Sequence, residues 1–537
     1  MKTTSAPAAL STRNEYLIVF LILIVAIVVR LYSINYDLPF VYDQDEPMFV
    51  QHALSMLKNR DPNPHWFGPP AGTTMYLLAL VYGGIYGVGR VIGTFQSAED
   101  FRNLYYSNPT VFYLAGRIIS AIFGVAMIWL VYKLGRRLFG PAAGLIAAGV
   151  LTLSPIHLLL SQQVRMDMQM TFLIVLAFWF CLNILERQDW TGYLLAGFFT
   201  GLAAVTKYPA IVFSLSIAIS HFIVTPSLRL SEHRKLVASA LACVVGAFAG
   251  SPFVFFDFHT VVKDVIQEAR PEHLSATGEG LLRNFIWYAK GPLPNALGLI
   301  GLLLAIVGLT LCLSSKQKSR WVLTSFPLLF LIFISSLSLR WERWILPVVP
   351  FFALLSAFAA THLIGVLRSR FSRGVTRLAA TVLLVVLFVP LLRSSISYAR
   401  ETAGPYTSTL ARNWMLDHIK GSRVLIEVYG PRLPATDFRV FVVDEAGQVV
   451  EAAILGGNAE PGWEIGRIKD LNELRTLGID YVLITGYYQH FLDEKGKYPT
   501  QVQTYERLIS GSKVVYDVQS IRGASRGPRV RILQLTR

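Results

Sequence analysis

The sequence predicts a multispanning α-helical membrane protein that ends in a soluble α/β domain. Of the 537 residues, 53% are hydrophobic and only 15% are charged. Apolar runs long enough to cross a bilayer recur up to about residue 395 and not beyond it. This composition excludes a disordered or fibrous chain and is too apolar for an ordinary soluble enzyme. The net charge of +15 raises nucleic-acid binding as an alternative, but such proteins are rarely this apolar.

Eleven apolar runs are expected to span the membrane. The first, roughly 16–36, is too long for the core of a signal peptide and has no small-residue cleavage site after it, so we expect an uncleaved signal anchor. The run 72–92 is also helix-length, but it is rich in glycine, and counting it as a span would invert every later loop. The others lie at approximately 111–132, 141–161, 168–185, 193–206, 208–224, 236–255, 293–313, 321–338, 345–366 and 378–394, with 193–206 and 208–224 the weakest pair.

The positions of the charges favour a topology in which 72–92 lies along the outer surface. The inside segments then carry sixteen cations, against the three acids Glu186, Asp189 and Glu232. Such an excess is typical of cytoplasmic loops, so the positive charge is an orientation signal and needs no nucleic-acid partner. The inside cations are Lys2, Arg13, Lys133, Arg136, Arg137, Arg187, Arg229, Arg234, Lys235, Lys316, Lys318, Arg320, Arg368, Arg370, Arg373 and Arg377. With an inside N-terminus, eleven spans place the C-terminus outside.

Composition changes after residue 395, which divides the chain into a membrane domain, 1–395, and an outer domain, 396–537. The second part contains eighteen Lys or Arg and sixteen Asp or Glu and has no spanning run. Short apolar strings alternate there with helix-like segments such as Ser408–Ile419 and Asp470–Leu477, which favours a small α/β fold. The expected strands are Arg423–Val428, Arg439–Val443, Tyr481–Ile484, Lys513–Asp517 and Val530–Leu535.

An acidic cluster follows the first span, in an outer loop expected over about 37–110 with surface helices. Asp43, Asp45 and Glu46 bring three carboxylates together just before a helix-like stretch. Such a cluster can act as a general base, as a metal ligand or as both. A solvated loop is the alternative interpretation.

Cations and a further carboxylate follow at other outer boundaries of the predicted spans. Arg165 and Asp167 lie between two spans, and Lys207 lies at the outer turn of a helical hairpin. Charged groups at such boundaries are costly to bury and are therefore paired or functional. A local Arg–Asp pair and a snorkelling lysine are the structural alternatives.

Two arginines in an aromatic segment complete the set of outer charges. Arg340 and Arg343 alternate with tryptophans, an arrangement that suits a phosphate clamp or an aromatic belt at the interface. The outer histidines are expected to be structural, and the three cysteines to be free thiols: His52, His65, His259, His273, Cys181, Cys243 and Cys312. Nucleotide-binding loops, nucleophile elbows and zinc motifs are missing from the sequence.

Together, these outer residues suit group transfer from a membrane-embedded donor with an anionic leaving group. A carboxylate would take a proton from an acceptor hydroxyl, and the cations would hold the departing phosphate. A transporter or flippase of a lipid-linked glycan would also need outer charges, and a non-catalytic scaffold is a third alternative. A transporter predicts charges deep within spans, of which Arg117 is one.

The same residues resemble those of the GT-C superfamily, and most closely glycosyltransferase family 39, which includes protein O-mannosyltransferases and lipid A aminoarabinose transferases. The matching strings run in the family's order over nearly the whole chain. They are Asp45-Glu46, Pro69-Pro70, Leu114–Gly140 around its Leu-Ala-Gly-Arg and Lys-Leu-Gly-Arg-Arg motifs, Arg165-Met166-Asp167, Gly201–Pro209 and Arg343–Pro350.

The resemblance implies a GT-C fold and an inverting transfer from a polyprenyl-phosphate-sugar donor at the outer membrane face. It implies Asp45 as the base, with Glu46 and Asp167 as further catalytic residues, and a divalent metal as an open alternative. Donor and acceptor contacts are expected from Asp43, Arg165, Lys207, Arg340 and Arg343. The acceptor would be a hydroxyl of a glycan, a lipid or a protein.

One departure from the family separates this chain from both subgroups. Gly68 stands before Pro69 where those relatives have lysine or histidine, so the phosphate must be held otherwise, or the substrates differ. The tail resembles that of bacterial members. We therefore expect an enzyme of the prokaryotic plasma (inner) membrane, with a cytoplasmic N-terminus and an outer C-terminal domain.

Overall fold

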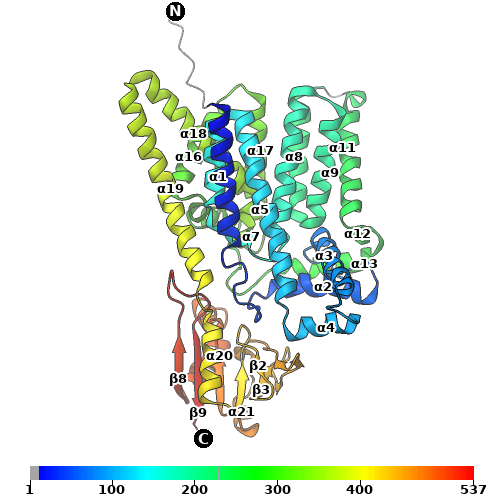
Figure 1. Ribbon diagram of the computed structural model, residues 1–537, viewed down its shortest axis with the longest axis vertical. Helices are drawn as coiled ribbons and strands as arrows, with labels where there is room; N and C mark the ends of the chain where they lie inside the picture. Colours follow the sequence, from blue (N-terminus) through cyan, green and yellow to red (C-terminus); the bar gives the residue numbers. More distant parts are fainter. Residues whose placement is uncertain (1–10, 228, 537) are drawn as a thin grey trace, which may run out of the picture.

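The computed structural model describes residues 11–227 and 229–536 as a bundle of long helices with an α/β domain at one end (Figure 1). Helix α1 starts at the end of the bundle opposite this domain. The predicted fold class, a multispanning helical chain with a C-terminal strand-containing domain, is confirmed. Of the inside cations, Lys2 lies outside the described residues.

Helices make up the chain as far as residue 403. They are α1 (Thr12–Leu31), α2 (Asp45–Asn59), α3 (Gly72–Val91), α4 (Ala98–Ser107), α5 (Thr110–Phe139), α6 (Pro141–Thr152), α7 (Pro155–Ser161), α8 (Asp167–Arg187), α9 (Trp190–Thr206), η1 (Tyr208–Phe213), α10 (Ser214–Val224), η2 (Leu230–His233), α11 (Arg234–Gly250), α12 (Phe253–Phe256), α13 (Phe258–Glu268), α14 (Leu281–Lys290), α15 (Pro292–Leu297), α16 (Leu299–Leu313), α17 (Lys318–Ser335), η3 (Glu342–Val348), α18 (Val349–Arg370) and α19 (Arg373–Ala403), where η marks a 3₁₀-helix.

Within the described ranges, six helical segments are long and apolar enough to cross a membrane, namely α1, α5, α8, α17, η3 with α18, and α19. Two bent pairs bring this number to eight: α6 with α7, bent by 63°, and α14–α15 with α16, bent by 110°. Helix α9 and the pair of η1 with α10 are apolar but shorter. The remaining run, 236–255, corresponds to α11 and α12, which are in none of these groups. All eleven predicted runs are helical. Helix α3 is outside the spanning group and lies with α2 and α4 at the end that carries the α/β domain (Figure 1).

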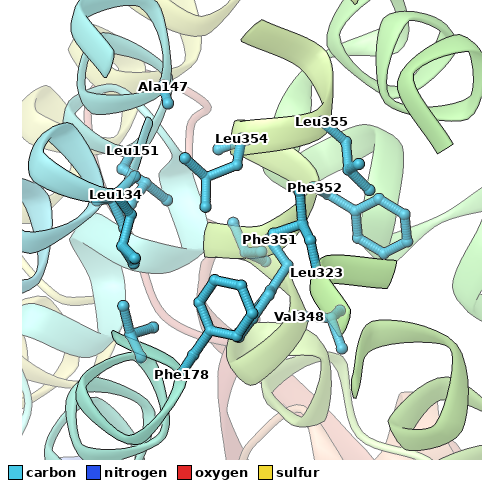
Figure 2. Packing of buried hydrophobic residues seen from close by; sticks show 14 of the residues in the cluster. Leu134, Ala147, Leu151, Phe178, Leu323, Val348, Phe351, Phe352, Leu354 and Leu355 are labelled. Carbon is cyan, nitrogen blue, oxygen red and sulfur yellow. The ribbon is translucent and has the colours of Figure 1, made fainter. Parts of the chain in front are cut away.

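Helix α18 forms the centre of the bundle. Its residues from Val349 to Ala360 are all buried, as expected of a helix that is apolar all round. Phe351 packs edge-on against Phe178 of α8, with 5.2 Å between ring centroids, and Leu354 belongs to the same cluster (Figure 2). This packing fixes α8, and with it the residues at the start of α8.

Helices α9 and α11 approach each other at glycine positions. A Cβ on Gly201 would lie 1.9 Å from the carbonyl oxygen of Cys243, and one on Gly197 would lie 2.0 Å from that of Ser239. Small residues let helix backbones pack this closely in membranes. The contact fixes the outer end of α9, where Lys207 is placed.

The C-terminal domain is built on a six-stranded sheet with the order β4-β3-β1-β7-β9-β8. Strands β3, β1 and β7 are parallel, and β4, β9 and β8 join antiparallel. All five predicted strands are present. The strands are β1 (Arg423–Ile426), β2 (Leu433–Pro434), β3 (Arg439–Val443), β4 (Val449–Glu451), β5 (Ile454–Leu455), β6 (Asn458–Ala459), β7 (Tyr481–Ile484), β8 (Ser512–Val518) and β9 (Val530–Leu535).

Short helices cover this sheet. They are α20 (Thr407–His418), η4 (Ile465–Arg467), α21 (Asn472–Thr476), α22 (Tyr487–Asp493) and α23 (Pro499–Ser510). The strands β2, β4, β5 and β6 were not predicted because each has only two or three residues. Helix α19 runs without a break through the expected boundary at 395, so we propose that the second domain begins after Ala403.

The outer domain is docked on the first outer loop of the bundle. The ring of Tyr42 stacks on Tyr406 with 4.4 Å between centroids, and the Tyr42 hydroxyl lies 2.9 Å from Oγ1 of Thr409. Arg526 forms an ion pair with Asp37. These contacts place the domain beside the acidic segment that starts at Asp43.

Candidate functional site

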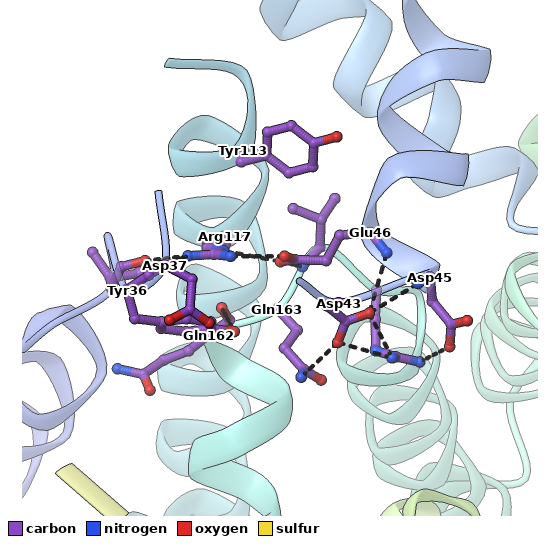
Figure 3. A network of polar contacts seen from close by, with 12 residues as sticks. Tyr36, Asp37, Asp43, Asp45, Glu46, Tyr113, Arg117, Gln162 and Gln163 are labelled. Atoms are coloured by element: carbon purple, nitrogen blue, oxygen red, sulfur yellow. Dashed lines mark hydrogen bonds and ion pairs between the residues drawn. The ribbon is translucent and has the colours of Figure 1, made fainter. Parts of the chain in front are cut away.

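The acidic segment forms the first turn of α2 and faces the loop between α7 and α8 (Figure 3). The Oδ1 atom of Asp43 accepts hydrogen bonds from the backbone N–H groups of Asp45, at 2.9 Å, and Glu46, at 3.3 Å. These N–H groups have no partner within the helix, so Asp43 orders the turn that presents the other two carboxylates.

Glu46 is fully buried and paired with Arg117 of α5. The guanidinium donates two hydrogen bonds to this carboxylate, from Nε to Oε1 at 2.9 Å and from Nη2 to Oε2 at 2.7 Å. The N–H of Val164 also donates to Oε1, at 2.8 Å. Because both Glu46 oxygens are engaged and hidden from solvent, we propose a positioning role for Glu46 in place of the predicted catalytic one.

Arg165 joins the other two carboxylates of the segment. Its Nη2 donates to Asp43 at 3.0 Å, and its Nη1 donates to Asp45 (Figure 3). Burial alone would raise the pKa of Asp43, but Arg165 and the two backbone donors outweigh it and hold this pKa below its ordinary value. Burial would lower the pKa of Arg165, yet Asp43 and Asp45 raise it above the ordinary value. Asp43 and Arg165 are therefore both charged at neutral pH.

Asp45 is the most accessible carboxylate of the site. Its side chain is 38% exposed, against 17% for Asp43 and 1% for Asp167. Besides Arg165, its Oδ2 faces Nη2 of Arg343 at 3.6 Å. The guanidinium of Arg343 lies over the ring of Trp341, 4.5 Å from the centroid. Two arginines thus meet at one half-exposed carboxylate.

Asp167 and Lys207 form a second charged pair, at the ends of α8 and α9. The Nζ atom of Lys207 donates to Oδ1 of Asp167 at 2.6 Å, whereas the buried Oδ2 has no hydrogen-bond partner among the described residues. A narrow cavity opens beside this pair. Its lining is otherwise apolar and consists of Met170, Pro209, Phe330, Ile334, Leu337, Trp344 and Pro347.

The segment around Gly68 is hydrogen-bonded to the turn that carries Lys207. The hydroxyl of Tyr208 donates to the carbonyl of Phe67 at 3.0 Å. A Cβ on Gly68 would lie 3.0 Å from Cγ of Glu268, so the space where a longer side chain would start is occupied. The surface loop is present as expected, but it offers no cation at this position.

Arg340 does not join the cluster. It forms an ion pair with Glu279 at 2.8 Å and lies 5.2 Å from the ring centroid of Trp287. Its predicted contact with substrate therefore has no support in the geometry, whereas Arg343, three residues later, reaches Asp45. The difference arises because η3 starts between them and turns only Arg343 towards α2.

The described residues, 11–227 and 229–536, contain no group of three or more His, Cys, Asp or Glu side chains that could hold a metal ion. The carboxylates of Asp43 and Asp45 face guanidinium groups, so they do not assemble as a ligand set. His52 stacks on Trp66 with 4.9 Å between ring centroids, and His65 lies 2.8 Å from a carboxylate oxygen of Asp61.

One contributor to the site was not singled out from the sequence. Gln163 donates to Oδ2 of Asp43 at 3.0 Å. Its role depends on how distant segments meet, so no local pattern identifies it. Trp344, which belongs to the arginine-tryptophan segment, lines the cavity. Arg117 was noted as a charge within a span and as part of the Leu-Ala-Gly-Arg string, and its position in a predicted helix already required a partner.

Comparison with known proteins finds a family model that matches part of the helical region. Residues 112–255 match the family model described as dolichyl-phosphate-mannose-protein mannosyltransferase. No curated protein sequence matches the chain significantly.

Solved structures share the fold at low sequence identity. The apo oligosaccharyltransferase of Archaeoglobus fulgidus is 13% identical with a TM-score of 0.53, covering 91% of this chain and 72% of its own. ArnT of Cupriavidus metallidurans bound to undecaprenyl phosphate is also 13% identical with a TM-score of 0.53, covering 97% of this chain and 98% of its own. The resemblance to the GT-C glycosyltransferases is therefore confirmed: the chain has their fold, and its residues 112–255 match the mannosyltransferase family model.

Proposed function

We propose that this chain is an integral membrane glycosyltransferase that moves a sugar from a polyprenyl-phosphate donor to an acceptor hydroxyl. The observation that carries the proposal is the half-exposed carboxylate of Asp45, which is flanked by Arg165 and Arg343. A base and an anion site stand side by side there, as direct displacement of a phosphate requires. The fold and the matched family model support the same class of reaction.

In this proposal Asp45 removes the proton of the acceptor hydroxyl. The acceptor oxygen forms a bond to the anomeric carbon, the bond from that carbon to the phosphate oxygen breaks, and the electron pair leaves with the phosphate. One displacement inverts the configuration at the anomeric carbon. The phosphate departs as a stable anion, so no general acid is needed.

The cations of the site suit the phosphate of the donor. Arg165 and Arg343 both approach Asp45 Oδ2, so a phosphate that binds them competes for their charge and frees the carboxylate. Lys207 adds a third cation beside a small cavity whose lining is otherwise apolar. A phosphate at the head of a lipid chain is an anion that such cations suit. ArnT is reported bound to undecaprenyl phosphate, a ligand of this kind.

A transporter or flippase fits the buried charges of the bundle less well. The guanidinium of Arg117 donates hydrogen bonds to Glu46 and to two backbone carbonyls. These are the carbonyls of Ile34, at 2.9 Å, and Tyr36, at 2.8 Å. Arg30 has no carboxylate partner among the described residues, but it donates to Oγ of Ser161 at 3.2 Å and lies 2.7 Å from Nδ1 of His157. Charged groups whose hydrogen bonds are made within the bundle do not line a pathway for a polar cargo.

The inside cations and the outer domain support an orientation with the site at the outer face of a prokaryotic plasma membrane. Arg136 and Arg137 at the end of α5 belong to the end of the bundle away from the α/β domain. The acceptor in this orientation is a hydroxyl of a glycan, a lipid or a protein outside the cell.

The test is to incubate purified full-length protein with a panel of polyprenyl-phosphate sugars, with water or added acceptors, and to follow sugar release by mass spectrometry. We expect release of polyprenyl phosphate from at least one donor, and its loss in the Asp45→Asn variant. Vesicle transport of the intact lipid-linked sugar without any turnover would contradict the proposal and favour the flippase.

A further inference from the structure

The outer domain presents a pair of stacked tyrosines at the carboxyl ends of two parallel strands. Tyr429 follows β1, and Tyr487 begins α22 directly after β7. Their rings stack with 5.3 Å between centroids and an interplanar angle of 23°. In open α/β sheets, ligands bind in the crevice beyond the carboxyl ends of parallel strands. The pair therefore stands where this fold holds ligands.

A chain of contacts runs from Tyr429 to the acidic segment through Ser408, Tyr406 and Tyr42. The backbone carbonyl of Tyr429 accepts a hydrogen bond from Oγ of Ser408 at 2.8 Å. Ser408 lies two residues after Tyr406, and the ring of Tyr406 stacks on Tyr42, the neighbour of Asp43. Burial raises the pKa of Tyr429, the hydrogen bond with Tyr487 opposes this rise, and the carboxylates of Asp45 and Asp43 add to it. The phenol thus lies within electrostatic reach of the carboxylate proposed as the base.

The backbone at Tyr429 is strained. Its φ of 63° falls in the left-handed region, which is uncommon for a bulky aromatic residue. The hydroxyl of Thr485 donates to the carbonyl of Val428, the residue just before Tyr429, at 3.0 Å. Strain that neighbouring contacts maintain is concentrated at functional sites.

The buried side chain of Glu427 connects the segments that follow β1 and β7, next to the two tyrosines. Glu427 is fully buried, and its Oε2 accepts from the N–H and the hydroxyl of Thr485 at 2.5 and 2.9 Å. Its Oε1 accepts from the N–H of Ile465 at 3.1 Å and from the hydroxyl of Tyr505. These bonds tie the ends of β1 and β7 together, so the two rings are held in one fixed arrangement. Glu427 is a positioning residue and has no contact with the acidic segment.

Tyr429 is the terminal ring of its stack. The far side of Tyr487 is turned to the domain core, where Phe491 lies at 6.3 Å between centroids. Tyr429 itself is only half-buried, and among the described residues no other ring stacks on it. Tyr429 thus ends the stack on the side away from Tyr487, and part of its side chain is exposed, with its hydroxyl paired to that of Tyr487.

We propose that the Tyr429–Tyr487 stack is the acceptor subsite, and that it binds a glycan by stacking against a sugar ring whose hydroxyl group points towards Asp45. This inference rests on the proposed glycosyltransferase function. A sugar ring has an apolar C–H face and a polar rim, which matches the face and the hydroxyl of a tyrosine. A rigid aromatic face of this kind binds at low entropic cost, because its rings are already in place.

The test compares ring deletion with a matched control in full-length protein. The backbone at Tyr429 suits glycine, so Tyr429→Gly removes the ring and relieves the strain at once. Tyr487→Ala is the second variant. Tyr516→Ala removes a ring that stacks on Trp414 at 5.1 Å, on a different part of the same domain, and serves as the control. For each protein, donor hydrolysis in water and transfer to a panel of soluble oligosaccharides are followed by mass spectrometry.

We expect Tyr429→Gly and Tyr487→Ala to raise the KM for the oligosaccharide about tenfold, which corresponds to about 1.4 kcal/mol of lost binding. Donor hydrolysis should stay within about twofold of the wild type, and Tyr516→Ala should leave both reactions unchanged. An unchanged acceptor KM in both variants would overturn the inference, as would transfer to hydroxyl-bearing peptides in place of oligosaccharides. If the wild type consumed no donor at all, the proposed function itself would fail.

Discussion

The ammonium group of Lys207 lies 2.6 Å from Oδ1 of Asp167, although the two residues come from opposite ends of a helical hairpin. Helix α8 starts at Asp167 and runs away from the site, and α9 returns to end just before Lys207. The second oxygen of Asp167 is buried with no hydrogen-bond partner in the described part of the chain. A buried acceptor in that state is costly, and a bound substrate that donates to it would remove the cost.

Replacing Lys207 by methionine is expected to weaken donor binding. A hydrogen bond between charged groups contributes roughly 1.5–3 kcal/mol, so the KM for a polyprenyl-phosphate sugar should rise about 10- to 100-fold in steady-state kinetics. The exposed Lys420→Met is the control, and its KM should not change. The double variant Asp167→Asn/Lys207→Met removes the unpaired acid as well. Recovery of the wild-type KM in this double variant would contradict a phosphate contact at Lys207.

The Glu46–Arg117 pair is expected to act through stability. Removing one partner of a fully buried ion pair leaves the other charge uncompensated, so Glu46→Gln should lower the free energy of unfolding by about 3–5 kcal/mol. Thermal unfolding in detergent measures this loss. The double variant Glu46→Leu/Arg117→Met should recover much of the melting temperature because no buried charge remains. A normal melting temperature with lost transfer activity in Glu46→Gln would instead restore Glu46 as a catalytic residue.

The site shows how far sequence reasoning reaches. The carboxylates and cations that meet in space were each visible as charged residues at the outer ends of apolar runs, which is why Asp45, Arg165, Lys207 and Arg343 were named. Their partners were not visible. Asp45 and Glu46 are neighbours in the first turn of α2, so their side chains point in different directions. Glu46 turns inward to Arg117 because α5 packs beside that turn, and Asp45 turns outward.

The Asp43–Arg165 pair should make stability depend on pH in the acid range. The pKa of Asp43 in the folded protein lies below the ordinary value of 3.8, so its contribution is fully present above that value and is lost as the pH falls through the lower folded-state pKa. The wild type should therefore melt at a higher temperature than Asp43→Asn above about pH 5, and the two should converge under stronger acid. Parallel curves over the whole range would show that the pair contributes no ionisation-linked stability.

The crossing of α9 and α11 should tolerate no added side-chain atom. A Cβ on Gly201 meets the carbonyl of Cys243 at 1.9 Å, so Gly201→Ala should cost about 1–3 kcal/mol and lower the melting temperature. Gly365 in α18 has no neighbour within 4 Å of its Cβ position. Gly365→Ala should therefore be neutral or slightly stabilising, because alanine is favoured over glycine within a helix. Equal melting temperatures for both variants would show that the helices separate more easily than the structure indicates.

The overall fold was more predictable than the interfaces within it. Apolar length and charge asymmetry are local properties, and they were sufficient for the eleven helical runs and the five longer strands. The run 193–206 was the weakest prediction because it is short, and the structure supplies the reason that it holds: glycines at 197 and 201 bring α9 against α11. The docking of the outer domain through Tyr42 and Tyr406 could not be predicted, since it joins residues more than 360 positions apart.

The central claim is that Asp45 is the base of a sugar transfer, and Asp45→Asn tests it most directly. Asparagine keeps the shape of the side chain but cannot take up the proton. With a donor that the wild type consumes, we predict that single-turnover transfer falls by about 10²- to 10⁴-fold, while the melting temperature and the binding of undecaprenyl phosphate are retained. Wild-type transfer by a well-folded Asp45→Asn protein would contradict the assignment of the base and the account of the site built on it.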